Sequence, residues 1–294
     1  MKKFLTFILV VITITGFSQK GPKNPFHTSH EIGLMFGTSN YVGDLAWKGT
    51  VPILKETNPA AFRPAGGVFY RATFTQFTSA RVSCSIGTIT GDDSQTNGDP
   101  ARLNRNLHFR SIIVECAAMF EWNMIPYQVG DMKRVCTPYI GIGAAAFYFN
   151  PQARYQGDWV ALQPLGTEGQ GIIEGKEKYS RFQFAVPASI GVKANVTKKI
   201  SLDLSFQYRY TFTDYLDDVS SPEYVSSQVF YEHYSEADAT MVDALAYRAI
   251  DPGQSPRNDD RRGEIKFRDH YYFVMLGVSY ALGSKSKTIK CYEF

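Results

Sequence analysis

The stretch Ile200-Ser201-Leu202-Asp203-Leu204-Ser205-Phe206-Gln207-Tyr208-Arg209-Tyr210 alternates apolar and polar side chains at every position. Successive side chains of a β-strand point to opposite faces, so this alternation predicts a strand whose two faces meet different surroundings. One face carries aliphatic and aromatic groups, and the other carries an acid, an amide and a base. Its length is close to the roughly 9–11 residues that a tilted membrane-spanning strand needs.

Seven other stretches show the same alternation, and their connectors are alternately long and short. The eight stretches lie near 31–39, 66–76, 79–90, 107–122, 137–149, 181–194, 199–212 and 269–282. A soluble sandwich would also alternate, but long strands with charges on the polar face favour a membrane barrel. The sequence therefore predicts an all-β fold, an eight-stranded antiparallel transmembrane β-barrel. Its long extracellular loops should contain short helices, and both termini should be periplasmic.

The N-terminal residues read as an export signal. Lys2 and Lys3 precede an apolar run that is too short to span a bilayer, and small residues follow it. We therefore expect a signal peptide over 1–18, a periplasmic stub over 19–30, the outer-membrane barrel over 31–282 and a periplasmic tail over 283–294.

Composition narrows the class of protein further. The formal net charge is only +3, which argues against a nucleic-acid-binding protein. Aromatic residues make up 14% of the chain, which suits both β-structure and a membrane interface. Outer-membrane lipid is accordingly the first expected partner.

An eight-stranded barrel is just wide enough to be filled by its own side chains. Charged residues on the polar strand faces should pair inside it, because unpaired charges there would be costly. The predicted lumen network comprises Arg71, Arg81, Glu115, Glu121, Lys193, Asp203 and Arg209. We interpret this interior as structural rather than as a pore, and we expect no cofactor.

Several loop motifs resemble a known family. They are Ser39-Asn40-Tyr41-Val42-Gly43-Asp44-Leu45, Gly91-Asp92-Asp93, Phe149-Asn150-Pro151-Gln152-Ala153, Leu162-Gln163-Pro164-Leu165-Gly166-Thr167-Glu168-Gly169-Gln170-Gly171 and Thr211-Phe212-Thr213-Asp214-Tyr215-Leu216-Asp217-Asp218-Val219-Ser220. In this order, over roughly 31–282, they resemble the PorG-like outer-membrane barrels of Bacteroidota.

The resemblance implies a component of the type IX secretion system, which exports proteins and in some species serves gliding motility. It also implies association with a periplasmic ring of PorK- and PorN-like subunits. The family carries no established catalytic residues. Candidate partner-binding or loop-organising residues in these motifs are Gln163, Pro164, Leu165, Gly166, Asp214, Tyr215, Asp217 and Asp218.

The last long loop carries two helix signals. Ser221-Pro222-Glu223 resembles a helix start, with serine as the cap and proline in the first turn. Ser235 with Asp238 resembles a capping box that opens a helix to about Ala249.

Four cysteines occur in the chain. By strand parity Cys84 and Cys116 should face lipid, where they would act as small apolar side chains. Cys136 and Cys291 should both lie in the periplasm. We hypothesise that these two pair with each other or with a partner protein.

Asp214, Asp217 and Asp218 form an acidic cluster that could bind Ca²⁺ or could form salt bridges with neighbouring loops. Their spacing does not match a calcium-binding loop, and no histidine in the barrel has a metal-ligand spacing. We therefore assign no metal site and no catalytic residue. The function favoured is a non-enzymatic barrel that anchors or organises the secretion machinery. The alternatives are a lipid-acting barrel enzyme and a stand-alone barrel that stabilises the envelope or adheres to ligands.

Overall fold

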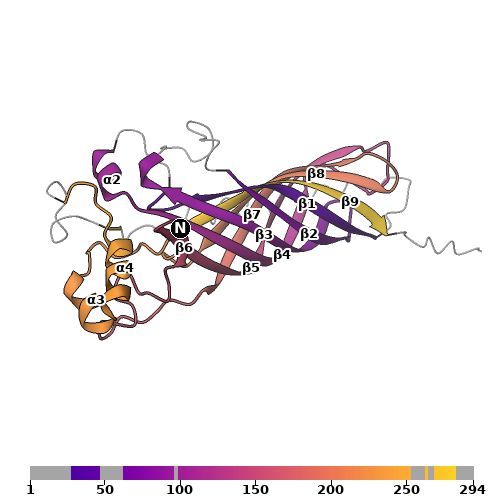
Figure 1. Ribbon diagram of the computed structural model, residues 1–294. Coiled ribbons are helices and arrows are strands. Elements are labelled where there is room, and N and C mark those ends of the chain that lie inside the picture. The colour runs from indigo at the N-terminus through magenta and orange to yellow at the C-terminus, as the bar shows by residue number, and fades with distance from the viewer. Residues whose placement is uncertain (1–27, 47–61, 96–98, 253–261, 264–267, 283–294) are drawn as a thin grey trace, which may run out of the picture.

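The computed structural model describes residues 28–46, 62–95, 99–252, 262–263 and 268–282 (Figure 1). Eight long strands form the wall of the molecule, and each is antiparallel to its neighbours. They are β1 (Ser29–Val42), β2 (Arg63–Thr73), β3 (Thr78–Asp92), β4 (His108–Asn123), β5 (Cys136–Tyr155), β7 (Phe182–Asn195), β8 (Ile200–Thr211) and β9 (His270–Leu282). All eight overlap the strands predicted from the sequence.

The sheet closes on itself. The strand order runs from β4 through β3, β2, β1, β9, β8 and β7 to β5, and β5 then pairs with β4. The first and last strands are neighbours, with Ile32 opposite Tyr280. Val114 of β4 lies opposite Tyr148 of β5 where the ring closes. The predicted eight-stranded antiparallel barrel is therefore confirmed.

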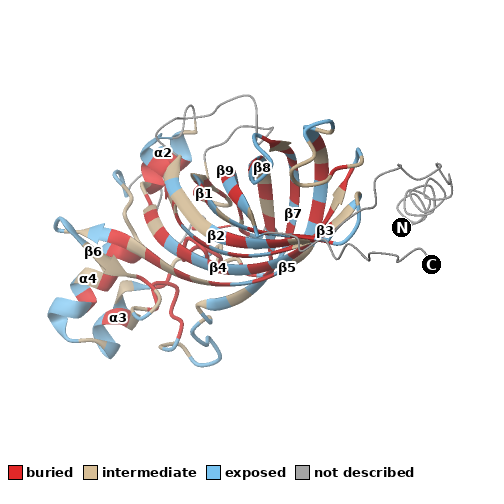
Figure 2. Cartoon of the chain, turned by 90° about the vertical axis from the view of Figure 1, so that its right-hand side faces the viewer, coloured by how far each residue is buried: buried red, intermediate tan, exposed pale blue. Residues whose placement is uncertain are grey.

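The two faces of the wall differ in the way that the alternation predicts. Outward-pointing side chains are apolar and exposed, as in Leu34 at 64% and Phe184 at 69%. Inward-pointing side chains are buried, so the strands carry alternating buried and exposed bands in Figure 2. An apolar outer band around a polar interior is the surface of an integral outer-membrane barrel, because lipid rather than water covers it.

The two ends of the barrel are built differently. At one end, here called the turn end, short connectors join β2 to β3 and β7 to β8, and a longer connector spans 124–135. At the other end, here called the capped end, the long loops carry β6 (Asp158–Ala161), α2 (Pro100–Arg105), α3 (Ser227–His233) and α4 (Glu236–Ala246). Figure 1 shows these elements gathered beyond one mouth of the barrel. No helix in the described parts of the chain is long and apolar enough to cross a membrane.

The helices of the last loop agree only in part with the prediction. Ser235 caps α4 and accepts a hydrogen bond from the backbone N–H of Asp238, as the capping-box pattern predicts. The predicted helix start at Ser221-Pro222-Glu223 is wrong, because α3 begins at Ser227. The carbonyl of Pro222 instead accepts a hydrogen bond from the backbone N–H of Arg262, so this segment holds a tertiary contact.

Two elements of the cap were not predicted. Helix α2 has Asp99 as its N-cap and Pro100 in its first turn, a start signal that the sequence does contain. Strand β5 extends well past the predicted end near residue 149 and pairs with β6 through a tight turn. Gly157 in that turn adopts a φ of 101°, a conformation that glycine accepts readily. The predicted signal peptide and C-terminal tail lie outside the described residues.

Candidate functional site

The half of the lumen nearest the turn end holds an ionic layer centred on Glu121. Its carboxylate lies 2.8 Å from Nε of Arg71 and 3.2 Å from Nε of Arg81. The ammonium of Lys193 lies 2.7 Å from the carboxylate oxygen that also contacts Arg71. All four side chains are buried, so each charge depends on these partners rather than on water.

Two further acids complete this layer. Arg71 also donates to Asp203, which in turn accepts a hydrogen bond from the Tyr139 hydroxyl at 3.0 Å. Glu31 lies 3.9 Å from Arg71 and accepts from the hydroxyl of Ser279. With Glu31, which the sequence analysis did not single out, the layer holds three basic and three acidic side chains. Its formal charges therefore cancel.

A second ion pair lies nearer the capped end. Arg209 binds Glu115 through two nitrogens, and the shorter contact is 2.6 Å. Tyr271 donates to Glu115 at 2.7 Å, and the guanidinium of Arg209 lies over the ring of Phe273. Around this pair the lumen is packed with a cluster of buried apolar side chains, seven of which are aromatic. The interior is thus an ionic layer followed by an apolar layer.

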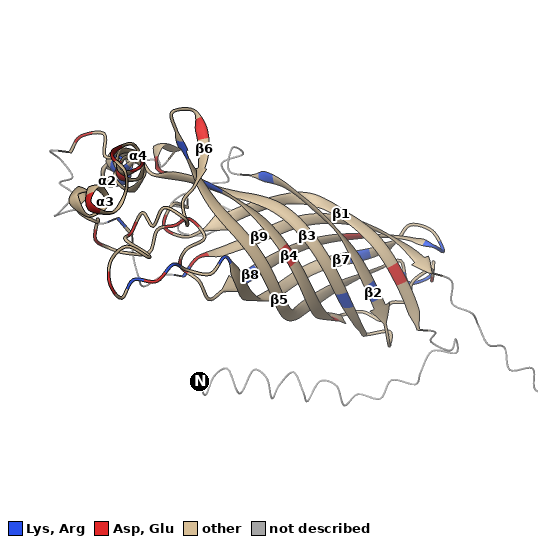
Figure 3. Ribbon diagram, turned by 60° about the horizontal axis from the view of Figure 1, so that its bottom comes forward, with Lys and Arg blue, Asp and Glu red and all other residues tan. Residues whose placement is uncertain are grey.

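The loops of the capped end are joined through one buried guanidinium, that of Arg262. It forms an ion pair with Glu168, and it donates to the hydroxyl of Thr167 at 3.1 Å. It also donates to the carbonyls of Asp218 and Ala246. One side chain therefore connects the 162–180 loop, the segment after β8 and the end of α4. Figure 3 shows charged residues frequent in this cap and sparse along the barrel wall.

A second hub forms around Asp93. Its carboxylate accepts from Nε of Arg102 at 3.0 Å and from Nε of Arg105 at 2.7 Å. Arg102 also donates to the carbonyl of Ala46, and Arg105 donates to the carbonyl of Arg262. The two hubs are therefore linked, and the cap is held to the barrel as one folded unit.

The acidic motif after β8 takes part in the same network. Asp218 is buried and accepts from the hydroxyls of Thr167 and Tyr179, and Arg262 lies 3.9 Å away. Burial raises the pKa of Asp218 to about 6. Tyr215 stacks on Tyr179, with ring centroids 4.6 Å apart.

The other two acids of that motif lie in different surroundings. Asp217 is fully buried, and an oxygen of its carboxyl group lies 2.7 Å from the hydroxyl of Tyr41. Asp214 is partly buried, and burial raises its pKa to about 7. Among the described residues, no group of three or more His, Cys, Asp or Glu side chains is placed to hold a metal ion.

The glycine-rich motif of the 162–180 loop holds this loop together and connects it to α3. Gln163 donates to the carbonyl of Tyr179 at 3.0 Å, and the carbonyl of Pro164 accepts from Lys178. The carbonyl of Leu165 accepts from the Tyr234 hydroxyl at 2.9 Å, which ties the loop to the end of α3. Gly166 turns the chain with a φ of 62°.

The long connector at the turn end is folded against the barrel mouth around Asn195. The side-chain carbonyl of Asn195 accepts from the Tyr127 hydroxyl at 2.7 Å and from the backbone N–H of Gly130 at 3.2 Å. Its amide donates to the carbonyl of Gln128 at 2.9 Å. A Cβ atom at position 130 would lie 2.5 Å from the carbonyl oxygen of Lys198, so only glycine fits there. This packing explains why the connector is longer than a simple turn.

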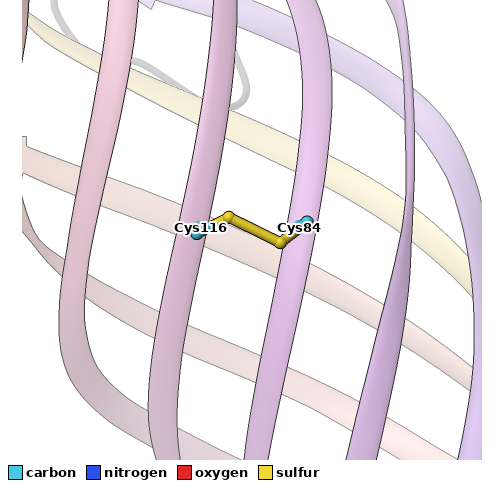
Figure 4. Close-up of a disulfide and its surroundings, with 2 residues drawn as sticks. All are labelled: Cys84 and Cys116. Carbon is cyan, nitrogen blue, oxygen red and sulfur yellow. A yellow bond between two sulfur atoms is a disulfide. The ribbon is translucent and has the colours of Figure 1, made fainter.

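The cysteines of β3 and β4 form a disulfide, Cys84–Cys116 (Figure 4). The two residues are direct register partners with Cα atoms 4.3 Å apart, and both are on the outer face. The prediction that they face lipid is therefore right, but treating them as two separate apolar side chains is wrong. Parity places each residue on a face, and only the register between two strands places them opposite each other. Cys136 is exposed at the start of β5 and has no disulfide partner among the described residues; Cys291 lies outside them, so the pairing of these two stays a prediction.

Comparison with known proteins gives a family but no close relative. The model of a family described as "Domain of unknown function (DUF6089)" matches residues 2–238. None of the curated proteins matches the sequence.

Among solved structures, Ail, the attachment invasion locus protein of Yersinia pestis, is 10% identical with a TM-score of 0.39, covering 87% of this chain and 100% of Ail. OprG from Pseudomonas aeruginosa is also 10% identical, with a TM-score of 0.38, covering 87% of this chain and 98% of OprG. Neisserial surface protein A is 10% identical with a TM-score of 0.34, covering 86% of this chain and 97% of that protein.

Proposed function

The chain belongs to the DUF6089 family, and we propose that it is a non-enzymatic outer-membrane barrel that anchors a protein-secretion assembly of the type IX class. In this proposal the turn end faces the periplasm and binds ring subunits of the PorK and PorN kind. The capped end then faces the exterior. The orientation follows from the connectors, because short turns are typical of the periplasmic side and long loops of the outer side.

The packed lumen supports an anchoring role rather than transport through the barrel. The ionic layer around Glu121 is formally neutral, and beyond it the lumen holds a layer of buried apolar side chains. An open channel would need a continuous polar path, which the buried apolar layer interrupts. The function must then lie on the surfaces that the barrel presents at its ends.

The observation that carries the proposal is the 124–135 connector. It is fixed in place by Tyr127 and Asn195, yet it exposes apolar side chains beyond the end of the strands. Met124 is 52% exposed, Ile125 is 50% exposed and Met132 is 45% exposed. A rigid loop that presents apolar side chains is suited to binding a protein partner, because little conformational entropy is lost on association.

The choice of assembly rests on the loop motifs. The segments around 39–45, 162–171 and 211–220 resemble PorG-like barrels, and that resemblance implies the periplasmic ring. A partner ring would meet the turn end, where the connector lies.

Affinity purification from detergent-solubilised outer membranes, followed by mass spectrometry, tests the proposal. Wild type should recover the ring subunits, and the double variant Met124→Asp/Ile125→Asp should lose them. Leu103→Asp, which changes an exposed apolar residue of α2 at the capped end, is the matched control and should retain them. If the wild-type barrel is recovered without ring subunits, from an extract in which the ring itself stays intact, the proposal is overturned.

A further inference from the structure

A group of arginines lies on the outer surface of the barrel at the rim of the capped end, around Trp159. Arg110 of β4 places its guanidinium 3.9 Å from the centre of the Trp159 ring, and Arg154 of β5 lies 5.3 Å from it. Arg248, which follows α4, donates to the carbonyl of Arg154 at 3.0 Å. Three separate segments of the chain thus bring positive charge to one place.

The group is held in position by neutral partners. Nε of Arg110 donates to the side-chain carbonyl of Gln152, its register partner on β5. The backbone N–H of Arg154 donates to Nε2 of His108, whose ring packs edge-on against Trp159. The contact with Gln152 fixes the guanidinium of Arg110 without neutralising its charge, and the contact with His108 fixes the backbone of Arg154 beside Trp159.

A fourth arginine extends this surface along β5. Arg181 donates to the side-chain carbonyl of Asn150 at 3.2 Å and lies over the ring of Tyr148. Asn150 and Gln152 point to the same side of β5, because alternate residues of a strand share a face. Arg110 and Arg181 therefore flank one strand, and neighbouring strands are about 4.8 Å apart.

Within the described residues, none of Arg110, Arg154, Arg181 and Arg248 forms an ion pair. The nearby carboxylate of Asp92 is occupied by the backbone N–H and hydroxyl of Ser94. Nε of Arg248 is buried and has no hydrogen-bond partner. Burial also lowers the pKa of Arg248, and the charge of Asp92 raises it.

The arginines border directly on the apolar band. Ile112 follows Arg110 on the same face of β4 and is 47% exposed, and Phe182 follows Arg181 and is 73% exposed. The group therefore lies where the acyl chains of a membrane end and its headgroups begin. A ligand at this level has an apolar part beside Ile112 and an anionic part beside the guanidinium groups.

We propose that Arg110, Arg154, Arg181 and Arg248, with Trp159, form a binding site for a phosphorylated lipid headgroup of the outer leaflet. Guanidinium groups bind phosphate through paired, charge-assisted hydrogen bonds, and the indole ring suits the membrane interface. The site goes beyond the anchoring function and does not involve the turn end. It uses the orientation proposed above only to place the lipid in the outer leaflet.

The test is lipid retention by the purified full-length barrel in detergent micelles, measured by native mass spectrometry. The probes are a glucosamine-based lipid with two phosphates and the same lipid after enzymatic dephosphorylation. Wild type should retain the phosphorylated form, and Arg110→Gln/Arg154→Gln should bind it at least about tenfold more weakly. Because micelles have no leaflets, this measurement does not depend on orientation or on ring subunits.

Arg268→Gln is the matched control, because Arg268 is an exposed arginine that lies over the ring of Phe212. It should bind the phosphorylated lipid like wild type. Unheated gel mobility shows that each variant is a folded barrel, and Arg181→Gln provides an independent variant if the double one does not fold. Equal retention of both lipids by wild type, or unchanged retention by the folded variants, would overturn the proposal. Displacement of the lipid by inorganic phosphate alone would overturn its assignment to a lipid.

Discussion

Asp217 and Asp269 share one hydrogen-bond partner, the hydroxyl of Tyr41, which lies 2.7 Å from an oxygen of each carboxyl group. A phenol has one hydrogen and donates to only one of them. The other contact needs a proton on the second carboxyl group, which then donates to the phenol oxygen. Burial raises the pKa of both acids, and the charge of Asp217 further raises that of Asp269. The structure therefore fits a pair that retains one proton near neutral pH.

This arrangement predicts that the cap loses stability as pH rises. Burial raises the pKa of Asp217 to about 8 in the folded state, whereas an aspartate in an unfolded chain titrates near 3.9. The folded state therefore binds more protons between these values, and its stability is greatest below about pH 4 and falls as pH rises towards 8. Hydrogen exchange of residues 213–220, measured at pH 5 and at pH 8.5, should show weaker protection at the higher pH.

Asp217→Asn is the informative variant for this prediction, because its amide donates to Tyr41 without titrating. The protection of residues 213–220 should change less between the two pH values in the variant than in wild type. A pH dependence equal to that of wild type would show that other groups are responsible.

Arg262→Met should loosen the cap while the barrel stays folded. The change leaves Glu168 and Asp218 buried without their cation, and breaking a buried ion pair in this way costs about 3–5 kcal/mol. Limited proteolysis of the folded protein should therefore cut the 162–180 loop and the 213–226 segment faster than in wild type. Arg268→Gln, at an exposed arginine of the same end, should leave the cutting rates unchanged. Resistance of Arg262→Met equal to that of wild type would contradict the role assigned to Arg262.

Glu121→Gln should destabilise the barrel itself. The substitution removes the acid that contacts Arg71, Arg81 and Lys193, and it leaves an excess of buried positive charge. We expect a loss of about 3–5 kcal/mol in the free energy of unfolding. Urea titration, followed by the mobility of folded and unfolded bands on gels, measures it. Glu177→Gln, at an exposed loop position, should unfold at the wild-type concentration of urea. An equal midpoint for both variants would refute the importance of this layer.

Removing the disulfide should weaken the barrel without opening it. Cys84 and Cys116 are separated by 32 residues in the sequence, and chain-entropy reasoning gives roughly 3–4 kcal/mol for a loop of this size. The double variant Cys84→Ser/Cys116→Ser should unfold at a lower urea concentration than wild type, and reducing agent should lower the wild-type midpoint to a similar extent. A midpoint unaffected by either treatment would show that the bond does not contribute to stability.

The barrel could be predicted because the alternation of side chains along each strand indicates what surrounds each of its two faces. Leu204 and Asp203 differ in side-chain character because one meets lipid and the other meets the lumen, and this difference is visible one residue at a time. The charges of the lumen follow from the same parity. Their pairing does not, because it depends on which strands lie opposite each other across the barrel. Glu31 was missed although it lies on the inward face of β1, where it is the register partner of Arg71 on the neighbouring strand β2 and contacts Ser279 of the other neighbour, β9.

The cap was predictable only where a local signal decides the structure. The Ser235–Asp238 capping contact is one such case. Arg262 and Asp93 gather partners from segments far apart in the chain, and no spacing in the sequence marks either as a hub. The same reasoning applies to Arg110 and Trp159, which meet only because β5 continues past the barrel and turns back as β6.

The pairing of β1 with β9 has a consequence for the insertion of the protein into the membrane. Residue 30 finds its partner at residue 282, so the ring stays open until the final thirteen-residue strand has been delivered. Until then β1 and β8 expose unpaired backbone groups, which lipid cannot hydrate. A prematurely terminated chain consequently fails to settle in the bilayer and stays accessible to degradation in the envelope. The last strand thus acts as a completeness check, since only a chain that extends through β9 removes both free edges.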